Sequence, residues 1–540
     1  MLAVAPRRAW AQNLAHGAFT HGVASGDPVA DGVVLWARFV GGDGAIAWEI
    51  AADEGFANVT QRGEARASPA SDYCVKVDAR GLAPDRRYFY RFLSGSGPSV
   101  TGQTRTAPAD GGSELTVALV SCANYAFGYF HAYRHIAARP DIDLVLHAGD
   151  YIYEYGDDEY PRTRDAVAGR TFDPSHEIVT LNDYYARYAA YHTDPDLLEL
   201  RRLKPIACVW DDHEIANQAT AGGAQNHQLS EGAYIDRVAA ASKAYFDWMP
   251  IRRPDSSARL YRYLDWGGLA RILLLDTRIA GRQRQLDYRS ALGLRLLQDN
   301  ARAAAAVEEF RRTQLNDPNR SMLGAEQEAW FAETLRQSHD RNQPWQIITQ
   351  QVVLGAQIVG EGAAGVVAPE THANTRRFVE VGERLGRFGM PWNLDAWDGY
   401  PAARTRLLQA CTTHARNAVV LSGDSHNCWL NTLPAETGGR LAAIEFAGGS
   451  VTSPGIERAL SGATPGQRET MMHTANAGLA WCDVSRRGYG ALRFTHDACH
   501  AEWVAFDDVR SPQMHAPILT RMDASASLNA GSGAWSVQNG

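Results

Sequence analysis

Residues 142–150 read "IDLVLHAGD", a short apolar run that ends on a glycine and a carboxylate. The apolar run "LTVALVS" (115–121) precedes it, and "YFHAYRHIAARP" (129–140) between them has the apolar spacing of an amphipathic helix. Two fully apolar strands joined by a helix are typical of a βαβ unit with parallel strands. The stretch therefore predicts an α/β domain.

Four further apolar runs continue this pattern, with helical stretches such as "AEQEAWFAETLRQ" (325–337) between them. These runs are "PIACVW" (205–210), "RILLLD" (271–276), "WQIITQ" (345–350) and "NAVVLS" (417–422). We expect the α/β domain to span residues 113–508. The Ser-, Gly- and Asn-rich segment 509–540 predicts a strand and a loosely held C-terminal tail.

The first part of the chain has a different period. Short β-branched and aromatic runs such as "GVVLWARF" (32–39) and "YFYRFLS" (88–94) are separated by turn residues. The phrase "GLAPDRRYFYRF" (81–92) resembles the strand-entry segment of fibronectin-type sandwiches. Residues 15–108 are therefore predicted to form a small fibronectin-like β-sandwich.

Composition narrows the class of protein. The chain has 540 residues, 45% of them hydrophobic, which is enough for more than one core. Its net charge of -8, from 53 Lys and Arg against 61 Asp and Glu, provides no basic field for nucleic acid. No apolar run approaches the roughly 20 residues of a transmembrane helix. We expect a soluble enzyme or binding protein with a small-molecule ligand, and the oligomeric state stays open.

The N-terminus suggests export. "AWAQ" (9–12) matches a small-x-small cleavage site, so residues 1–14 are interpreted as the end of an export signal and a linker, with a frayed terminus as the alternative. A periplasmic or secreted location agrees with an odd number of cysteines, which leaves at least one thiol unpaired. The seven cysteines are Cys74, Cys122, Cys208, Cys411, Cys428, Cys482 and Cys499.

Polar side chains follow the predicted strands at their carboxyl ends, where ligands of α/β sheets bind. Taken singly, an Asp after a strand commonly caps a helix and a buried Cys commonly packs. Five such ends together bring many carboxylates to one place, and their mutual repulsion requires cations. We therefore predict a polynuclear metal site. The residues concerned are Cys122, Asp150, Tyr153, Asp211, Asp212, His213, Glu214, Asn217, Asp276, Arg278, Asp424, His426 and Asn427.

The donor types indicate a mixed site. Thiolate, phenolate and imidazole suit a transition metal, and phenolate favours ferric iron, whereas Asp and Asn oxygens suit calcium, magnesium or manganese. Asp150 is the candidate bridge between the two kinds of metal. Asp211 and Asp398 are further candidate ligands. For Asp398, in "DAWDGY" (395–400), aromatic packing with an incidental carboxylate is an equal alternative.

The order of these motifs resembles that of PhoD-like alkaline phosphatases, a group that includes a calcium-dependent phospholipase D within the metallophosphoesterase superfamily. The resemblance covers nearly the whole chain, from "FTHGVASGDPVADGVVLWAR" (19–38) through "HAGDYIYEYG" (147–156) and "VWDDHE" (209–214) to "VVLSGDSHNCWLNTL" (419–433). It implies a four-layer αββα metallophosphoesterase domain preceded by the β-sandwich. It also implies one Fe3+ with Ca2+ ions.

The resemblance also implies which residues bind the first metal. "GDYIY" matches the family's GDxxY motif, which implies that Asp150 bridges the metals and that Tyr153 is a ferric phenolate. Cys122 stands where many relatives carry an aspartate. Asp424 and His426 match the first and last positions of the GHxH motif.

The predicted ligands of the second metal differ from the family pattern, and the differences all favour oxygen over nitrogen ligands. "DDHE" aligns with GNHE, which implies that Asp212 binds the second metal and that His213 lies near the substrate phosphate. Asp212 replaces Asn, Asp424 replaces His, and no His follows the strand at 345–350. We therefore expect a site richer in oxygen, as calcium prefers over zinc.

The expected activity is hydrolysis of phosphate monoesters, diesters or both by metal-bound hydroxide. His213 would contact the phosphoryl group or assist the leaving oxygen. Arg278 would bind the phosphate in a bidentate manner or, as an alternative, pair with an acidic neighbour. Asn217 would bind calcium or substrate. A phospholipase D-type diesterase acting on lipid head groups and a non-catalytic exported binding protein are the other hypotheses.

Overall fold

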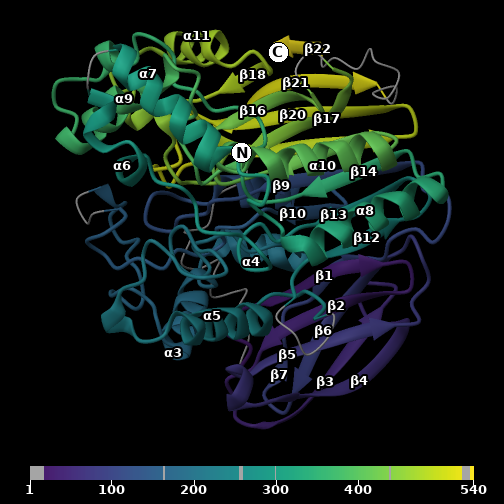
Figure 1. The fold of residues 1–540 in the computed structure, drawn as a ribbon. Helices are drawn as coiled ribbons and strands as arrows, with labels where there is room; N and C mark the ends of the chain where they lie inside the picture. Colours follow the sequence, from purple (N-terminus) through teal and green to yellow (C-terminus); the bar gives the residue numbers. More distant parts are fainter. Residues whose placement is uncertain are drawn as a thin grey trace.

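The computed structural model describes residues 18–161, 165–253, 259–297, 300–436, 439–525 and 536–539. The predicted export segment therefore lies outside the described residues. Figure 1 shows the N-terminal strands at one end of the molecule and the C-terminal strands at the other. No helix of the described chain has the length and apolar character needed to cross a bilayer.

A large sheet of the described chain runs the length of the molecule. Its β9, β10 and β11 are parallel, as the βαβ pattern predicts, while β19, β20 and β21 continue it in antiparallel fashion. In order across the sheet the strands are β22(Ser536–Asn539), β21(Ile518–Ser525), β20(Ala498–Phe506), β19(Arg487–Thr495), β9(Glu114–Val120), β10(Leu144–His147), β11(Pro205–Cys208), β1(Val23–Val29), β2(Gly32–Arg38) and β5(Cys74–Arg80).

A second sheet packs face to face against the first. Its central strands β13, β14, β15 and β17 are parallel, and antiparallel strands flank them. The order is β12(Arg262–Trp266), β13(Ala270–Leu274), β14(Trp345–Thr349), β15(Ala418–Ser422), β17(Leu441–Gly448), β16(Cys428–Pro434) and β18(Leu479–Asp483).

Helices cover the outer faces of the two sheets, which completes a four-layer αββα arrangement (Figure 1). α8 and α10 cover the second sheet, and α2 and α4 lie on the first. The longer helices are α2(His131–Ala138), α3(Leu181–Tyr191), α4(Pro195–Leu203), α5(Tyr234–Trp248), α7(Asn300–Phe310), α8(Gly324–Asp340), α9(Ala373–Gly386), α10(Pro401–His414) and α11(Pro465–Ala475), and α6(Tyr288–Ala291) is a single turn.

The continuous apolar runs of the central strands follow from burial on both faces. In β14, Ile347 belongs to the core between the two sheets, whereas its neighbour Ile348 belongs to the core beneath α8 and α10. Successive side chains of a strand point to opposite faces, so a strand between two cores is apolar at every position. The four-layer fold predicted through the family resemblance is confirmed.

The predicted N-terminal β-sandwich is also present. Its second sheet consists of β4(Val59–Ala67), β3(Gly44–Ala51), β6(Arg87–Ser94) and β7(Gly97–Pro98), with β8(Gly102–Arg105) paired to β6. Residues such as Leu35 and Val33 from β2 pack against Ile50 and Phe92 from this sheet. The other face of the sandwich is made by β1, β2 and β5, which continue the large first sheet.

This continuity joins the sandwich to the α/β part more tightly than a linker would. β1 pairs in parallel with β11, with Ser25 opposite Pro205 and Gly26 opposite Ile206. Beside this junction, the buried Asp27 accepts hydrogen bonds from Arg262 at 2.7 and 2.9 Å. The sequence-based boundary at residue 108 thus separates two segments whose strands share one sheet.

Candidate metal centre

Sharp turns follow the carboxyl ends of three parallel strands at the same edge of the two sheets. Four predicted ligands in these turns have positive φ angles: 57° for Cys122, 55° for Asp150, 58° for Asp424 and 61° for His426. This left-handed region is uncommon for residues with a side chain, and such residues gather at functional sites. The turns aim side chains from β9, β10 and β15 into one space.

Two glycines allow these turns to pack closely. At Gly149, with φ 98°, an added Cβ would lie 2.4 Å from the Cβ of Asp211. At Gly423 it would lie 2.8 Å from the Cβ of Ser121. Backbone hydrogen bonds hold the turns in place, among them Cys122 N–H to the Gly149 carbonyl at 3.1 Å. Larger residues at either glycine would separate the loops that carry the candidate ligands.

One group of donors fits the soft metal site expected from the sequence. A sulfur of Cys122, a carboxylate oxygen of Asp150 and a nitrogen of His426 lie within 4.8 Å of one another. The Tyr153 hydroxyl lies 3.0 Å from Asp150 Oδ2 and 3.4 Å from His426 Nε2. His426 Nδ1 lies 2.9 Å from the Pro454 carbonyl oxygen, which can only accept a hydrogen bond. The proton therefore sits on Nδ1, and Nε2 faces the cluster with its lone pair.

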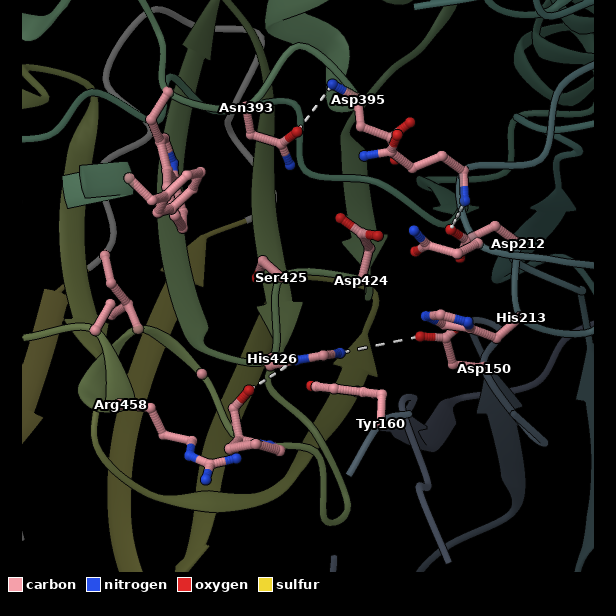
Figure 2. Close-up of a pocket in the computed structure, with 18 of the residues that line it drawn as sticks. Asp150, Tyr160, Asp212, His213, Asn393, Asp395, Asp424, Ser425, His426 and Arg458 are labelled. Carbon is pink, nitrogen blue, oxygen red and sulfur yellow. Dashed lines mark hydrogen bonds and ion pairs between the residues drawn. The ribbon is translucent and has the colours of Figure 1, made fainter. Parts of the chain in front are cut away.

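Two further groups are rich in oxygen. Asp150, Asp212 and His213 form one of them, and Asp211, Asp212 and Asp424 form the other, each within 4.8 Å. Asp150 belongs to both the soft group and an oxygen-rich group, and Asp212 joins the two oxygen-rich groups. Figure 2 shows the carboxylates of Asp150, Asp212 and Asp424 facing a common space, with His426 and His213 on opposite sides.

Nearby positive charge would stabilise the ionised forms of the buried donors in the cluster. Burial, followed by the charge of Asp150, raises the pKa of the Cys122 thiol and the Tyr153 hydroxyl well above their usual ranges. Burial also raises the pKa of Asp150 and brings that of Asp424 to about 7. Buried carboxylate oxygens of Asp150 (Oδ1), Asp211 (Oδ2) and Asp212 (Oδ1) have no hydrogen-bond partner in the described chain. Bound cations would satisfy these oxygens and stabilise the ionised donors.

Arg278 is fully buried within the acidic part of the cluster. Its guanidinium pairs with Asp211 and with Asp395 at 2.7 Å, and it lies 3.2 Å from Asp424 and 3.5 Å from Asp212. All of these partners are carboxylates, and Arg278 is not among the residues that line the adjacent cavity. The geometry favours the salt-bridge alternative over a phosphate contact. Arg278 thereby fixes the directions of the carboxylates around it.

His213 is held by a buried carboxylate that the sequence analysis did not select. Its Nδ1 lies 2.7 Å from Glu154 Oε2, while Glu154 Oε1 accepts from the Asn217 backbone N–H at 2.7 Å and from Asn226 Nδ2 at 3.0 Å. Burial lowers the pKa of His213, but the charges of Asp212 and Glu154 outweigh burial and raise it well above the usual range. The nitrogen Nε2 is left for the cavity.

Asn217, for which the sequence predicts a role as a ligand of calcium or of substrate, lines the cavity. Its Nδ2 donates to Gln225 Oε1 at 2.7 Å, which leaves Oδ1 as the acceptor of the amide group. This acceptor suits either a hard cation or a donor group of a substrate.

Glu214 is a further residue that the sequence analysis placed in the cluster without a role. Its carboxylate accepts backbone hydrogen bonds from Asp150 at 3.1 Å, Tyr151 at 2.5 Å and Asp211 at 2.7 Å. Burial raises its pKa to about 8. Glu214 thus joins the turn after β10 to the turn after β11.

Asp398 is not brought to the cluster. It accepts from the backbone N–H of Gln357 at 2.8 Å, and burial raises its pKa to about 6. Asp395, three residues earlier, is the carboxylate that reaches Arg278 and lines the cavity. Two sequence features could have identified the missed residues. Asp395 lies in the same "DAWDGY" motif as Asp398, and Glu154 directly follows Tyr153. The sequence alone does not show which of these carboxylates points toward the candidate site.

A cavity of about 590 Å³ opens onto the cluster, within the range of ordinary ligand pockets. Figure 2 shows Asp150, Asp212 and His213 on one side and Arg458 on the other. Its lining comprises Asp150, Tyr155, Tyr160, Asp212, His213, Asn217, Gln218, Gln357, Asn374, Thr375, Phe378, Trp392, Asn393, Asp395, Asp424, Ser425, His426, Pro454, Gly455, Ile456, Arg458 and Ala459. The seven cysteines are all buried, and none is paired in a disulfide.

Comparison with known proteins extends over nearly the whole chain. Residues 117–503 match the PhoD-like phosphatase family, and residues 3–108 match the N-terminal domain of PhoD-like phosphatases. Alkaline phosphatase D of Bacillus subtilis (strain 168) is 35% identical over 467 residues, which cover 82% of this chain and 71% of that protein. A solved structure titled "Structure of PhoD" matches with a TM-score of 0.76 and 30% identity, covering 97% of this chain and 93% of that chain.

Proposed function

This chain belongs to the PhoD-like phosphatase family, and from that premise we propose that it hydrolyses phosphate monoesters, diesters or both at the cluster around Asp150. Membership of the family makes the chain a phosphatase, an enzyme of the phosphoesterase class. This identity argues against the hypothesis of a non-catalytic binding protein. The substrate class is a small phosphate ester.

The observation that carries the proposal is the shared position of Asp150. Its carboxylate belongs to a group with a thiol and an imidazole and also to a group with a second carboxylate, Asp212. We assign Fe3+ to the first group, held by Cys122, Asp150, Tyr153 and His426, and Ca2+ to the oxygen-rich groups. When bound, such cations neutralise phosphoryl oxygens and lower the pKa of a water molecule that attacks phosphorus.

The residues of the chain then have separate tasks. His213, held through Nδ1 by Glu154, presents Nε2 to the cavity, where it donates a proton or a hydrogen bond to a phosphoryl or leaving-group oxygen. Arg278 acts as a positioning residue, because its contacts orient Asp211 and Asp424. Asn217 contributes Oδ1 to a cation or to the substrate.

Elemental analysis combined with a panel of substrates tests this proposal. Purified protein is expected to contain iron and calcium, to hydrolyse aryl phosphate mono- or diesters, to lose activity with strong chelators and to recover it with calcium. Phospholipid head-group diesters form a separate arm of the panel, which tests the phospholipase D-type alternative. Undiminished rates after confirmed removal of all metals would contradict the metal-dependent mechanism.

We further propose that the protein is exported and that the mature chain begins near Gln12, because "AWA" precedes this residue. Mass spectrometry of the N-terminus of the secreted protein checks this expectation. Intact protein retained in the cytoplasm would contradict it.

A further inference from the structure

The cavity extends well beyond the residues that are proposed to hold cations and phosphate. Asp150, Asp212 and His213 line one part of it, and α9 together with segments 392–395 and 454–459 lines another. A volume of about 590 Å³ matches pockets that hold a whole small molecule of drug size, for which roughly 300–1,000 Å³ is usual. The part lined by α9 is therefore available to the alcohol portion of a phosphate ester.

Two aromatic side chains form the wall of that part. Phe378, on α9, is 48% exposed, which makes it the most exposed phenylalanine among the described residues, and it lines the cavity. Trp392 also lines the cavity, and its ring centroid lies 5.3 Å from that of Phe378 at an interplanar angle of 59°. The buried Ile456 adds an aliphatic surface. An exposed aromatic ring inside a ligand cavity is a surface for contact with an apolar ligand.

The wall is held in place before a ligand arrives. The Trp392 backbone N–H donates to the Gln357 carbonyl at 3.1 Å. On α9, Glu383 accepts from the Ala364 N–H at 2.8 Å, and an added Cβ at Gly386 would lie 2.1 Å from the Val359 carbonyl oxygen. The helix is therefore packed directly on the 358–364 segment. Fixed walls reduce the entropy lost on binding.

The charges around the wall favour an uncharged group. The cationic side chains of the cavity lining are His213, at the cation end, and Arg458. The Arg458 guanidinium lies 3.7 Å from Asp165 and over the ring of Phe127, 5.4 Å from the ring centroid. Its charge is thus already partly balanced. The wall offers aromatic and aliphatic contacts in place of a second anion site.

We propose that Phe378, Trp392 and Ile456 form the subsite for the leaving alcohol and that this subsite takes a flat, uncharged aromatic group. The inference rests on the proposed phosphoesterase function and names the substrate class of the same site. Because Phe378 and Trp392 line the same cavity as Asp150, the ring and the phosphoryl group of one ester would share this cavity. Loss of an aromatic pair of this kind corresponds to a change of up to about tenfold in an equilibrium constant.

Steady-state kinetics of Phe378→Ala and Phe378→Leu test the subsite. For 2-naphthyl phosphate, we expect kcat/KM to fall about tenfold in Phe378→Ala and by a smaller factor in Phe378→Leu, because leucine keeps apolar bulk without the ring. For methyl phosphate, the same substitutions should lower kcat/KM less than about twofold. Each substrate is compared with itself across variants, so the intrinsic reactivity of its leaving group cancels.

A matched control and a binding measurement complete the test. Tyr263→Ala removes another exposed aromatic ring, on β12 and outside the cavity lining, and should change neither substrate's kcat/KM. Affinities for naphthylphosphonate and methylphosphonate, measured by calorimetry, should show the same selective loss in Phe378→Ala. Melting temperature and metal content show whether each variant is folded and loaded.

The outcomes separate this inference from the proposed function. Equal losses for the naphthyl and methyl compounds, or no loss for either, would overturn the subsite. An equal response of n-octyl phosphate would overturn its preference for a flat ring. Wild-type protein that hydrolyses no phosphate ester would refute the proposed function, while the phosphonate affinities would still test the subsite.

Discussion

Replacing Glu154 with glutamine would test how His213 is positioned. Glu154 is fully buried, and its Oε1 accepts from the Asn217 backbone N–H and from Asn226, while Oε2 faces Nδ1 of His213 at 2.7 Å. In Glu154→Gln, the two N–H donors hold the amide oxygen at the Oε1 position. The NH2 group then faces Nδ1 of His213. Because an NH2 group cannot accept a proton, Nδ1 must become the acceptor and the charge-assisted hydrogen bond is lost.

The size of the effect follows from that bond. A hydrogen bond to a charged group contributes about 1.5–3 kcal/mol, which corresponds to a loss of roughly 10- to 150-fold in kcat/KM if it is needed in the transition state. Glu154 is also one of the charges that raise the pKa of His213. Its removal lowers that pKa, so the fall of activity at alkaline pH should begin at lower pH in the variant.

The assay is kcat/KM for an aryl phosphate across pH, with metal content measured in parallel. Glu49→Gln is the matched control, because Glu49 pairs with Arg91 at 2.9 Å in the N-terminal sheet, far along the chain from the cluster. In a double-mutant cycle, Glu154→Gln should have little further effect once His213 is glutamine. Losses that add, or a kcat/KM within about twofold of wild type in Glu154→Gln, would refute the positioning role.

Tyr153→Phe should shift or remove a visible charge-transfer band and should lower the iron stoichiometry per folded molecule. Cys122→Ser should also lower the iron stoichiometry. An unchanged iron stoichiometry in both variants would contradict the ligand assignment. Asp27→Asn should lower the free energy of unfolding by about 3–5 kcal/mol in denaturant titrations, because it leaves Arg262 buried without its charge partner, and a loss below 1 kcal/mol would contradict this. Burial lowers the pKa of His147 to about 3, below its unfolded value near 6.5, so its contribution to stability is present above pH 6.5 and is lost as pH falls toward 3. In His147→Gln, the slope of the unfolding free energy against pH should therefore be smaller in this window, by up to roughly 1.4 kcal/mol per pH unit. An unchanged slope would argue against this prediction.

Much of the architecture was accessible from local patterns. Residues 144–146 and 347–348 are apolar at consecutive positions because their strands are buried on both faces, and this pattern can be read directly in the sequence. The polar residues after such strands were also predictable, because parallel strands end at one edge of a sheet. Asp150 and His426 were selected on this basis, and the structure brings them together.

Pairing between distant segments was not accessible in the same way. The N-terminal sandwich reads as a separate unit because the strand and turn signals of residues 15–108 are local. β1 nevertheless joins the large sheet at β11, some 180 residues later in the chain, through backbone hydrogen bonds that are almost independent of side-chain identity. A strand's composition therefore predicts that it pairs, but not with which partner.

The roles of individual charged residues depended most on tertiary structure. Asp395 and Asp398 are equally plausible in sequence, but the short turn at Trp397–Gly399 directs Asp398 to the backbone of Gln357 and leaves Asp395 to meet Arg278. The direction in which each of these two carboxylates points is set by the φ and ψ angles of a few loop residues, and the rest of the fold fixes those angles. The sequence by itself determined the buried strands, the strand ends and the kinds of donor gathered there, and the four layers were expected from its resemblance to a known family. Only the tertiary structure decided which carboxylates face the cavity, which one contacts His213, and which aromatic rings line the cavity.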